Sequence, residues 1–136
     1  MKPSDSISRR QFVTTSASVL GTFAIVSNYK AHAVGANEKV VIGLMGCGGR
    51  GTYVAKMFAE RPDVDFAYIC DVDTRRFSRA RDQIEEAQGK PPKAVQDFRK
   101  MLDDKRVDAI INATPDHWHA LGSIMACQAG KDVYVE

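Results

Sequence analysis

The stretch VVIGLMGCGGRG, residues 40–51, decides the fold of this chain. Its apolar first half is typical of a buried strand over Lys39–Met45. Its second half matches the pattern G-x-G-x-x-G, which joins a strand to a helix in dinucleotide-binding folds. In that pattern Gly46 permits the tight turn, Gly48 lets a diphosphate approach the backbone, and Gly51 lets the helix pack closely on the strand. The sequence therefore predicts a backbone cradle for a dinucleotide diphosphate where the first helix begins.

An acidic residue follows the glycine turn at the spacing that this fold requires. Asp71 lies directly after the second apolar stretch, Val64–Cys70, and 20 residues after Gly51. A carboxylate at the end of the second strand accepts hydrogen bonds from the adenosine ribose, and it repels the 2′-phosphate of NADP. Arg75 and Arg76 follow and could receive that phosphate, or they could lie in a solvated first helical turn. NAD is the expected cofactor, and NADP stays possible.

Two other interpretations of the glycine turn stay open. A glycine-rich turn between a strand and a helix can exist without a ligand, and methyltransferases combine a similar turn with an acidic second-strand end. The methyltransferase turn usually carries an acidic residue before its glycines, and Leu44-Met45 offers none. The strand, turn, helix and distant acid together favour dinucleotide binding over both.

Strand-like and helix-like stretches alternate along the rest of the chain. We expect strands at Lys39–Met45, Val64–Cys70, Lys93–Gln96, Val107–Ala113 and Asp132–Val135, and helices at Thr52–Glu60, Thr74–Gln88, Asp97 or Phe98 to Asp104, and Pro115–Ala129. In the last helix Leu121, Ile124, Met125 and Gln128 lie along one side. This alternation predicts an α/β fold, a doubly wound parallel sheet (Rossmann) with helices on both faces. The last strand would leave a long, apolar, uncovered edge, so residues 34–136 alone should be poorly soluble.

The basic surplus of the chain lies at its N-terminus. The 136 residues carry a formal charge of +2. Residues 1–33 alone hold four basic residues against Asp5, which is +3 and leaves −1 for the remainder. A near-neutral body lacks the basic footprint expected of a nucleic-acid-binding protein. A basic N-terminal segment is more often a targeting signal.

Residues 1–33 have the three-part layout of a secretory signal. The polar Met1–Arg10 is followed by the uncharged Val13–Val26 and by Ala31-His32-Ala33, an A-x-A-like cleavage site. The uncharged stretch would extend about 21 Å as a helix, short of the ~30 Å bilayer core, so a stable membrane span is not expected. Within this segment Ser8–Val13, SRRQFV, resembles the twin-arginine export motif.

These features predict a signal peptide at residues 1–33 and a dinucleotide-binding domain at residues 34–136. The expected partner in export is the twin-arginine machinery, and the expected location is the periplasm. An uncleaved amphipathic arm is the alternative for the N-terminal segment.

The cysteines and histidines give weaker signals. The chain has three cysteines at irregular spacing, Cys47, Cys70 and Cys127. An odd, irregular set does not indicate a disulfide framework, so each is predicted to be a small buried apolar residue. His117 and His119 could begin a metal site, but residues 34–136 offer neither a third histidine nor a nearby cysteine pair, so no metal is expected. Trp118 could be a platform for substrate, or could cover the sheet edge at the start of its helix.

Three segments resemble the N-terminal domain of the Gfo/Idh/MocA oxidoreductase family. They are residues 40–51, the stretch ICDVD at residues 69–73, and ATPDHWHA at residues 113–120 followed by GKDVYVE at residues 130–136. The resemblance implies a second α/β domain after this one, and homo-oligomers are possible. It also implies that Glu136 begins an E-K-P motif whose catalytic lysine would be residue 137, so no catalytic residue is expected in this chain.

The resemblance also implies roles for individual residues. Gly46, Gly48, Gly49, Arg50 and Gly51 would line the pyrophosphate, Asp71 would hold the adenosine ribose, Thr114, Pro115 and His119 would border the nicotinamide half, and Glu136 would approach the nicotinamide ribose. The implied activity is hydride transfer between a nicotinamide cofactor and a sugar or polyol-like substrate. The rival expectation is a non-catalytic dinucleotide-binding fragment, inactive alone because the lysine and the substrate domain are missing.

Overall fold

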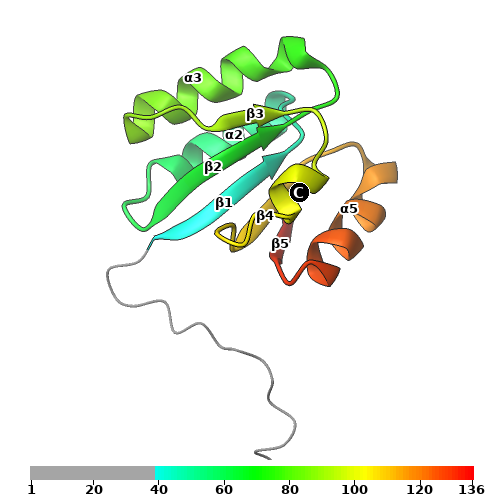
Figure 1. The fold of residues 1–136 in the computed structure, drawn as a ribbon. Helices are drawn as coiled ribbons and strands as arrows, with labels where there is room; N and C mark the ends of the chain where they lie inside the picture. Colours follow the sequence, from blue (N-terminus) through cyan, green and yellow to red (C-terminus); the bar gives the residue numbers. More distant parts are fainter. Residues whose placement is uncertain (1–38) are drawn as a thin grey trace, which may run out of the picture. The chain divides into compact units, whose positions relative to one another are not determined.

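The computed structural model describes residues 39–136, which form a single five-stranded parallel sheet flanked by helices (Figure 1). The strands are β1 Val40–Met45, β2 Val64–Cys70, β3 Lys93–Val95, β4 Ala109–Asn112 and β5 Asp132–Val135, in the order β3-β2-β1-β4-β5. The helices are α2 Gly49–Ala59, α3 Phe77–Gln88, α4 Arg99–Leu102 and α5 Asp116–Gln128, and a 3-10 turn, η1, spans Thr74–Arg76. The predicted doubly wound α/β fold is confirmed.

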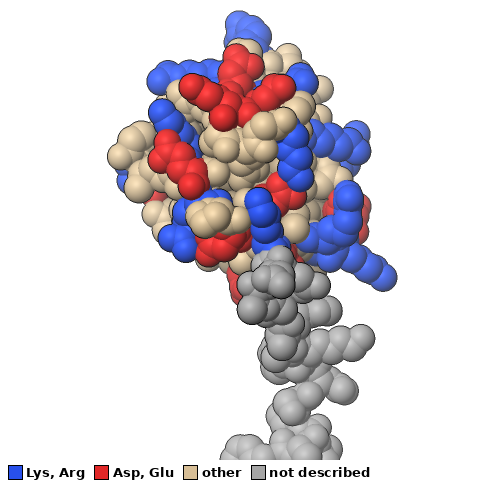
Figure 2. All heavy atoms as spheres, turned by 90° about the vertical axis from the view of Figure 1, so that its left-hand side faces the viewer, with Lys and Arg blue, Asp and Glu red and all other residues tan. Residues whose placement is uncertain are grey.

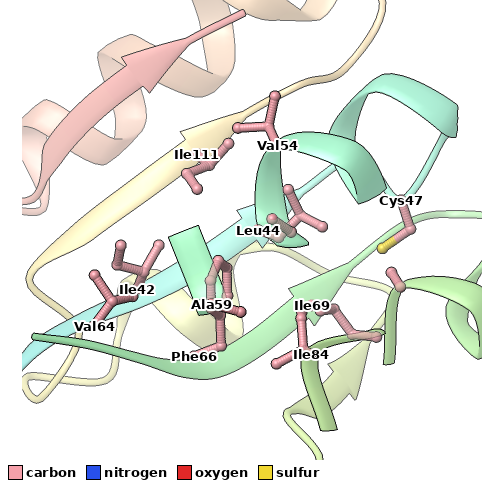
Figure 3. Close-up of a cluster of buried hydrophobic side chains, with 12 residues drawn as sticks. Ile42, Leu44, Cys47, Val54, Ala59, Val64, Phe66, Ile69, Ile84 and Ile111 are labelled. Carbon is pink, nitrogen blue, oxygen red and sulfur yellow. The ribbon is translucent and has the colours of Figure 1, made fainter. Parts of the chain in front are cut away.

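The sheet has an apolar core on each of its faces. Ile42 and Leu44 of β1 pack with the buried side chains of α2 and α3, a cluster shown in Figure 3. The neighbouring Met45 packs instead with Met101 of α4 and Ala126 of α5. Side chains along a strand alternate between faces, so a central strand buried on both sides must be apolar throughout. This explains the unbroken apolar run of β1.

The strand order reverses at β1, which pairs with β2 on one side and with β4 on the other. Ligands of such sheets bind outside the carboxyl ends of the strands at this point of reversal. The pairing of β1 with β2 slips between Ile42 and Gly43, whose partners are Phe66 and Tyr68, so Ala67 is an extra residue. The bulge reverses the alternation of β2, because Phe66 and Ile69 share one core cluster. The bulge therefore changes which side chains at the carboxyl end of β2 face each side of the sheet.

Several element boundaries differ from those expected. Helix α2 begins at Gly49, three residues before the expected Thr52, because glycines can form the first turn of a helix that a ligand or backbone approaches closely. The polar helix expected from Thr74 begins instead with the turn η1. Strand β4 is shorter than the expected Val107–Ala113, and β5 matches its expectation.

The side of α5 predicted from apolar spacing is not the side that packs on the sheet. The buried residues of α5 are Gly122 and Ala126, and Leu121 and Ile124 are 48% and 55% exposed. A Cβ on Gly122 would collide with the end of the Met45 side chain. Small residues therefore let α5 lie close to the sheet. Of the large apolar residues on the predicted side, Leu121 and Ile124 face outward, whereas Met125 packs against the core.

Two other expectations are wrong. Cys127 is exposed, whereas Cys47 and Cys70 are buried as predicted. The apolar edge of β5 is real, since Tyr134 and Val135 are about half exposed, but at four residues this edge is short rather than long. Short edge strands limit pairing with other chains.

Acidic and basic side chains are interspersed on the face of the molecule drawn in Figure 2. The expected signal peptide, its twin-arginine motif and its cleavage site lie outside the described residues. Within residues 39–136, none of the helices has the length and apolar character needed to cross a bilayer.

Candidate functional site

A cleft of about 830 Å³ opens at the carboxyl ends of β1, β2 and β4. Its wall contains Gly46 after β1, Asp71 after β2, and Thr114 and Pro115 after β4. Trp118 at the start of α5 also lines it and is 43% exposed. Residues that follow three different strands, as far apart in the sequence as Gly46 and Pro115, thus meet at one edge of the sheet.

The glycine turn needs glycine at two of its positions. Gly46 has a φ of +98°, and a Cβ there would lie 2.5 Å from the carbonyl oxygen of Ala113. A Cβ on Gly51 would collide with the carbonyl oxygen of Gly46. The first position therefore turns the chain out of β1, and the second lets α2 lie against that turn, as the sequence predicted.

The N-terminus of α2 lies open beside this turn. Gly48 is its N-cap residue, no side chain caps the helix, and its first turn holds no acidic residue. The first amides of a helix have no partner within the helix, and the helix dipole places about half a positive charge there. A Cβ on Gly49 would meet nothing within 4 Å, so the approach to these amides is unobstructed. The arrangement suits a phosphate group.

Asp71 is bound to the glycine turn itself. Its Oδ2 accepts a hydrogen bond of 2.9 Å from the backbone N–H of Cys47, and its Oδ1 accepts one of 2.9 Å from the N–H of Asp73. Each carboxylate oxygen has a second lone pair, so the side chain can still accept a hydrogen bond from a ligand hydroxyl. The sequence predicted the ligand contact but missed this clamp between β2 and the turn.

The two arginines after Asp71 are held differently. Arg75 makes a two-bond pair with Asp73, at 2.8 and 2.9 Å, which the sequence did not predict. Arg76 makes a looser contact with Asp73, with 3.7 Å between its Nε and Oδ2 of Asp73. Its Nη1 would lie 3.4 Å from a Cβ built on Gly48. Of the two guanidinium groups, that of Arg76 is therefore the one beside the glycine turn.

His119 stabilises the loop that follows β4 through a hydrogen bond. Its ring Nε2 donates a hydrogen bond of 2.6 Å to the carbonyl oxygen of Thr114, because a carbonyl can only accept. His119 is half-buried and is not part of the cleft wall, whereas Thr114, Pro115 and His117 are. The sequence did not reveal the role of the fully buried Asn112, which is hydrogen-bonded to Thr114 in the same loop.

Arg50 and Glu136 are brought together away from this cleft wall. Their side chains form a hydrogen-bonded ion pair, and Glu136 Oε2 also accepts a bond of 2.7 Å from the hydroxyl of Tyr134. The Tyr134 hydroxyl, and after it the Arg50 guanidinium, hold the pKa of the Glu136 carboxyl below its usual value. This pair joins the first turn of α2 to the end of β5.

The buried thiols near the site are not nucleophiles. Burial, and after it the Asp71 carboxylate, raises the pKa of both Cys47 and Cys70 to about 12. Both therefore stay protonated near neutral pH and act as small packing groups. Among residues 39–136, His, Cys, Asp and Glu side chains form no group of three that could hold a metal ion.

Comparison with protein-family models identifies the family to which this fold belongs. Residues 40–136 match the family GFO_IDH_MocA, described as an oxidoreductase family with an NAD-binding Rossmann fold. A glycosyl hydrolase family 109 protein of Stenotrophomonas maltophilia is 35% identical over 96% of this chain, and one of Saccharopolyspora erythraea is 31% identical over 98%. The chain spans 30% and 34% of the lengths of these relatives, or about a third.

Solved structures agree with this comparison. The WlbA dehydrogenase of Bordetella pertussis, in complex with NADH and UDP-GlcNAcA, is 27% identical, with a TM-score of 0.61 over 73% of this chain and 27% of its own. An NAD-binding protein of Listeria innocua is 26% identical, with a TM-score of 0.59 over 72% of this chain and 26% of its own. This chain belongs to the Gfo/Idh/MocA oxidoreductase family, and its residues 40–136 form the NAD-binding Rossmann domain of that family.

Proposed function

We propose that the cleft and the glycine turn bind NAD with the diphosphate over the N-terminus of α2 and the adenosine ribose at Asp71. The observation that carries this placement is the cradle itself. Gly46 and Gly51 leave no room for a Cβ, and the helix α2, which begins at Gly49, has neither a side-chain cap nor an acid in its first turn. A diphosphate would satisfy those amides, and a ribose hydroxyl would use the free lone pairs of Asp71.

The chain's own residues would bind and orient the cofactor, which supplies the hydride chemistry when bound. The amides that follow Gly48 would hold the diphosphate, and Arg50 lies in the same helical turn. Thr114 and Pro115 would also border the cofactor, because they line the same cleft as Asp71. The nicotinamide contacts implied for His119 and Glu136 fit less directly, since His119 braces the loop and Glu136 pairs with Arg50.

Titration of the complete protein with NAD and NADP tests this placement. Asp71→Asn should weaken NAD binding by about 10- to 100-fold, because a charged acceptor of a ligand hydrogen bond is lost. Asp65→Asn makes the same charge change at the other end of β2, where Asp65 pairs with Lys90 at 2.8 Å, and should leave the affinity unchanged. Equal affinities of the two variants for NAD would refute the assignment of Asp71.

We infer that the complete protein transfers hydride between NAD and a sugar- or polyol-like substrate. The family is one of oxidoreductases, and a structural neighbour at 27% identity holds NADH together with a nucleotide sugar. The part of the protein beyond this domain would supply the substrate pocket and the base that takes the hydroxyl proton. Formation of reduced nicotinamide, followed by its absorbance across a panel of sugars and polyols, tests the inference. No reduction of bound NAD by any of them would contradict it.

A second candidate is glycoside hydrolysis, because both curated relatives described above are named glycosyl hydrolase family 109 proteins. Some glycosidases depend on NAD, so a nicotinamide site does not exclude this activity. Nitrophenyl glycosides separate the two candidates. Nitrophenol release without net accumulation of reduced nicotinamide indicates hydrolysis, and accumulation with free sugars indicates a dehydrogenase.

We propose further that residues 1–33 direct export through the twin-arginine pathway, and that NAD is bound before export and retained. That pathway carries folded proteins, and the periplasm has no steady supply of free nicotinamide cofactor. The motif SRRQFV supports the proposal. Replacing Arg9 and Arg10 by lysine should keep the protein in the cytoplasm. Periplasmic protein that contains no nicotinamide would contradict cofactor retention.

A further inference from the structure

Asn112 ends β4 as the only polar residue of the stretch AIIN, and it is completely buried. Burying an amide without hydrogen bonds is unfavourable, so hydrogen-bond partners must compensate for its burial. Ile110 and Ile111 beside it pack into the two apolar cores of the sheet. Nothing in the packing of β4 calls for an amide at this position, which points to its hydrogen bonds as the reason for it.

The orientation of the Asn112 amide follows from its partners. Its Nδ2 donates to the carbonyl oxygen of His119 at 3.1 Å and to Oγ of Ser123 at 3.2 Å. A carbonyl oxygen cannot donate, so the nitrogen of the amide must face α5. The side-chain oxygen of Asn112 therefore faces the loop after β4, where it lies 2.7 Å from Oγ1 of Thr114.

This orientation decides what the Thr114 hydroxyl can offer to a ligand. Because Oδ1 of Asn112 can only accept, the Thr114 hydroxyl must use its single proton to donate to it. Only lone pairs then remain on Oγ1, and Thr114 lines the cleft. The backbone of Thr114 is fixed as well, since its carbonyl oxygen accepts a hydrogen bond from His119. Thr114 is thus held as a pure hydrogen-bond acceptor in the cleft wall.

We propose that Asn112 is a positioning residue for the cofactor, which fixes the Thr114 hydroxyl as an acceptor for an O–H or N–H of the adenosine half of the dinucleotide. Thr114 and Asp71 line one cleft, which favours the adenosine half over the nicotinamide half that the family resemblance implied for Thr114. The inference rests on the NAD site proposed above and adds a residue that does not itself touch the ligand.

A double-mutant cycle on ADP binding to the complete protein tests this role. Thr114→Val removes the hydroxyl at constant shape and should weaken ADP binding about tenfold, whereas Thr114→Ser should stay within about threefold of wild type. Asn112→Leu should weaken binding about as much as Thr114→Val. The double variant should be no more than about threefold weaker than either single variant, because both remove the same interaction.

The outcomes separate this inference from the proposed function. If wild-type protein binds neither NAD nor ADP, the proposed function fails. If it binds both, but the two substitutions multiply to about a hundredfold, Asn112 acts only on the general fold and the inference is overturned. If Thr114→Val binds ADP as tightly as the wild type, the inference is also overturned, whatever the ADP affinity of Asn112→Leu.

Asn112→Asp covers the case in which Asn112→Leu does not fold. A carboxyl group keeps the acceptor for the Thr114 hydroxyl but replaces the amide that donates to His119. Binding of adenosine, a neutral probe, should then stay within about threefold of wild type while the protein becomes less stable. A loss of adenosine affinity of about tenfold or more would overturn the inference.

Discussion

Gly51 and Asp71 each connect two parts of the site. Gly51 lets α2 lie directly against the carbonyl of Gly46, and Asp71 ties the same turn to the end of β2 through the amide of Cys47. A helix N-terminus that points at a ligand must be held at a fixed distance from the strands. These two residues set that distance before any ligand is bound.

Gly51→Ala should therefore destabilise the protein by about 1–3 kcal/mol, the usual cost of forcing a group into a filled site. The new Cβ would push α2 away from the turn, because it faces a backbone oxygen that cannot rotate aside. Gly49→Ala, in open space two residues earlier, is the matched control and should change stability by less than about 0.5 kcal/mol. Urea denaturation measures both. Equal midpoints for the two variants would show that Gly51 is not a packing requirement.

Arg76, and not Arg75, should govern binding of NADP. Arg76 lies beside Gly48, whereas Arg75 is engaged by Asp73. Arg76→Ala should weaken NADP binding about tenfold more than NAD binding, because a guanidinium bound to an extra phosphate contributes about 1.5–3 kcal/mol. Arg75→Ala should change neither affinity appreciably. The same ratio of NADP affinity to NAD affinity in Arg75→Ala and Arg76→Ala would contradict the assignment.

At this scale the sequence predicted the residues of the glycine turn, because sterically required glycines leave a pattern. It could not predict Asn112 or the bracing role of His119. Their partners are a neighbouring loop and helix whose position depends on the packed sheet. Cys127 was wrongly expected to be buried, because a cysteine in an apolar helix gives no sign of which side of the helix it occupies.

Among the secondary-structure elements, three turns have the same local chemistry. In the segments Asp73–Arg75, Asp97–Arg99 and Asp104–Arg106, the aspartate accepts bonds from both the backbone N–H and the guanidinium of the arginine two residues later. Asp73 lies directly before η1, and Asp97 lies two residues before the start of α4. Such turns satisfy the first amides of a helical segment without a partner from elsewhere in the fold.

These turns predict acid sensitivity. The side-chain hydrogen bonds of Arg75 and Arg99 lower the pKa of Asp73 and of Asp97 to about 2. A pKa lower in the folded than in the unfolded state stabilises the fold above the unfolded value near 4 and loses that effect as the pH falls toward 2. The urea midpoint should therefore fall between pH 4 and pH 2, and less steeply in Asp97→Asn. An identical slope in wild type and variant would contradict this.

The order and type of the elements followed from periodicity, but their packing did not. The bulge at Ala67 has no glycine or proline to reveal it, yet it determines which side chains of β2 face each core. The side of α5 that packs on the sheet was predicted from its large apolar residues, whereas close approach is possible only through Gly122 and Ala126. Close packing by small residues reverses the usual inference from hydrophobic spacing.

For the described domain as a whole, two apolar surfaces face outward. One is formed by Trp118, Leu121 and Ile124 on α5, and the other by Tyr134 and Val135 at the edge strand β5. Clustered apolar side chains of this kind mark surfaces that other protein covers or that promote association. The chain spans about a third of the length of these relatives.

Residues 34–136 expressed alone should therefore associate as concentration rises, despite the short β5 edge. Light scattering or sedimentation across a concentration series measures this. Leu121→Lys combined with Ile124→Lys, on the exposed side of α5, should reduce the association, and Lys56→Glu, an exposed change on α2, should not. A single monomeric species at every concentration would contradict the expectation.

We propose that the glycine turn holds the diphosphate of NAD and that Asp71 holds its adenosine ribose. The most direct test is a crystal structure of the complete protein with NAD. The diphosphate should lie within hydrogen-bond distance of the amides that open α2, and the adenosine ribose hydroxyls should reach Asp71 while it still accepts from Cys47. A diphosphate bound elsewhere, or a ribose that leaves Asp71 without contact, would contradict the account.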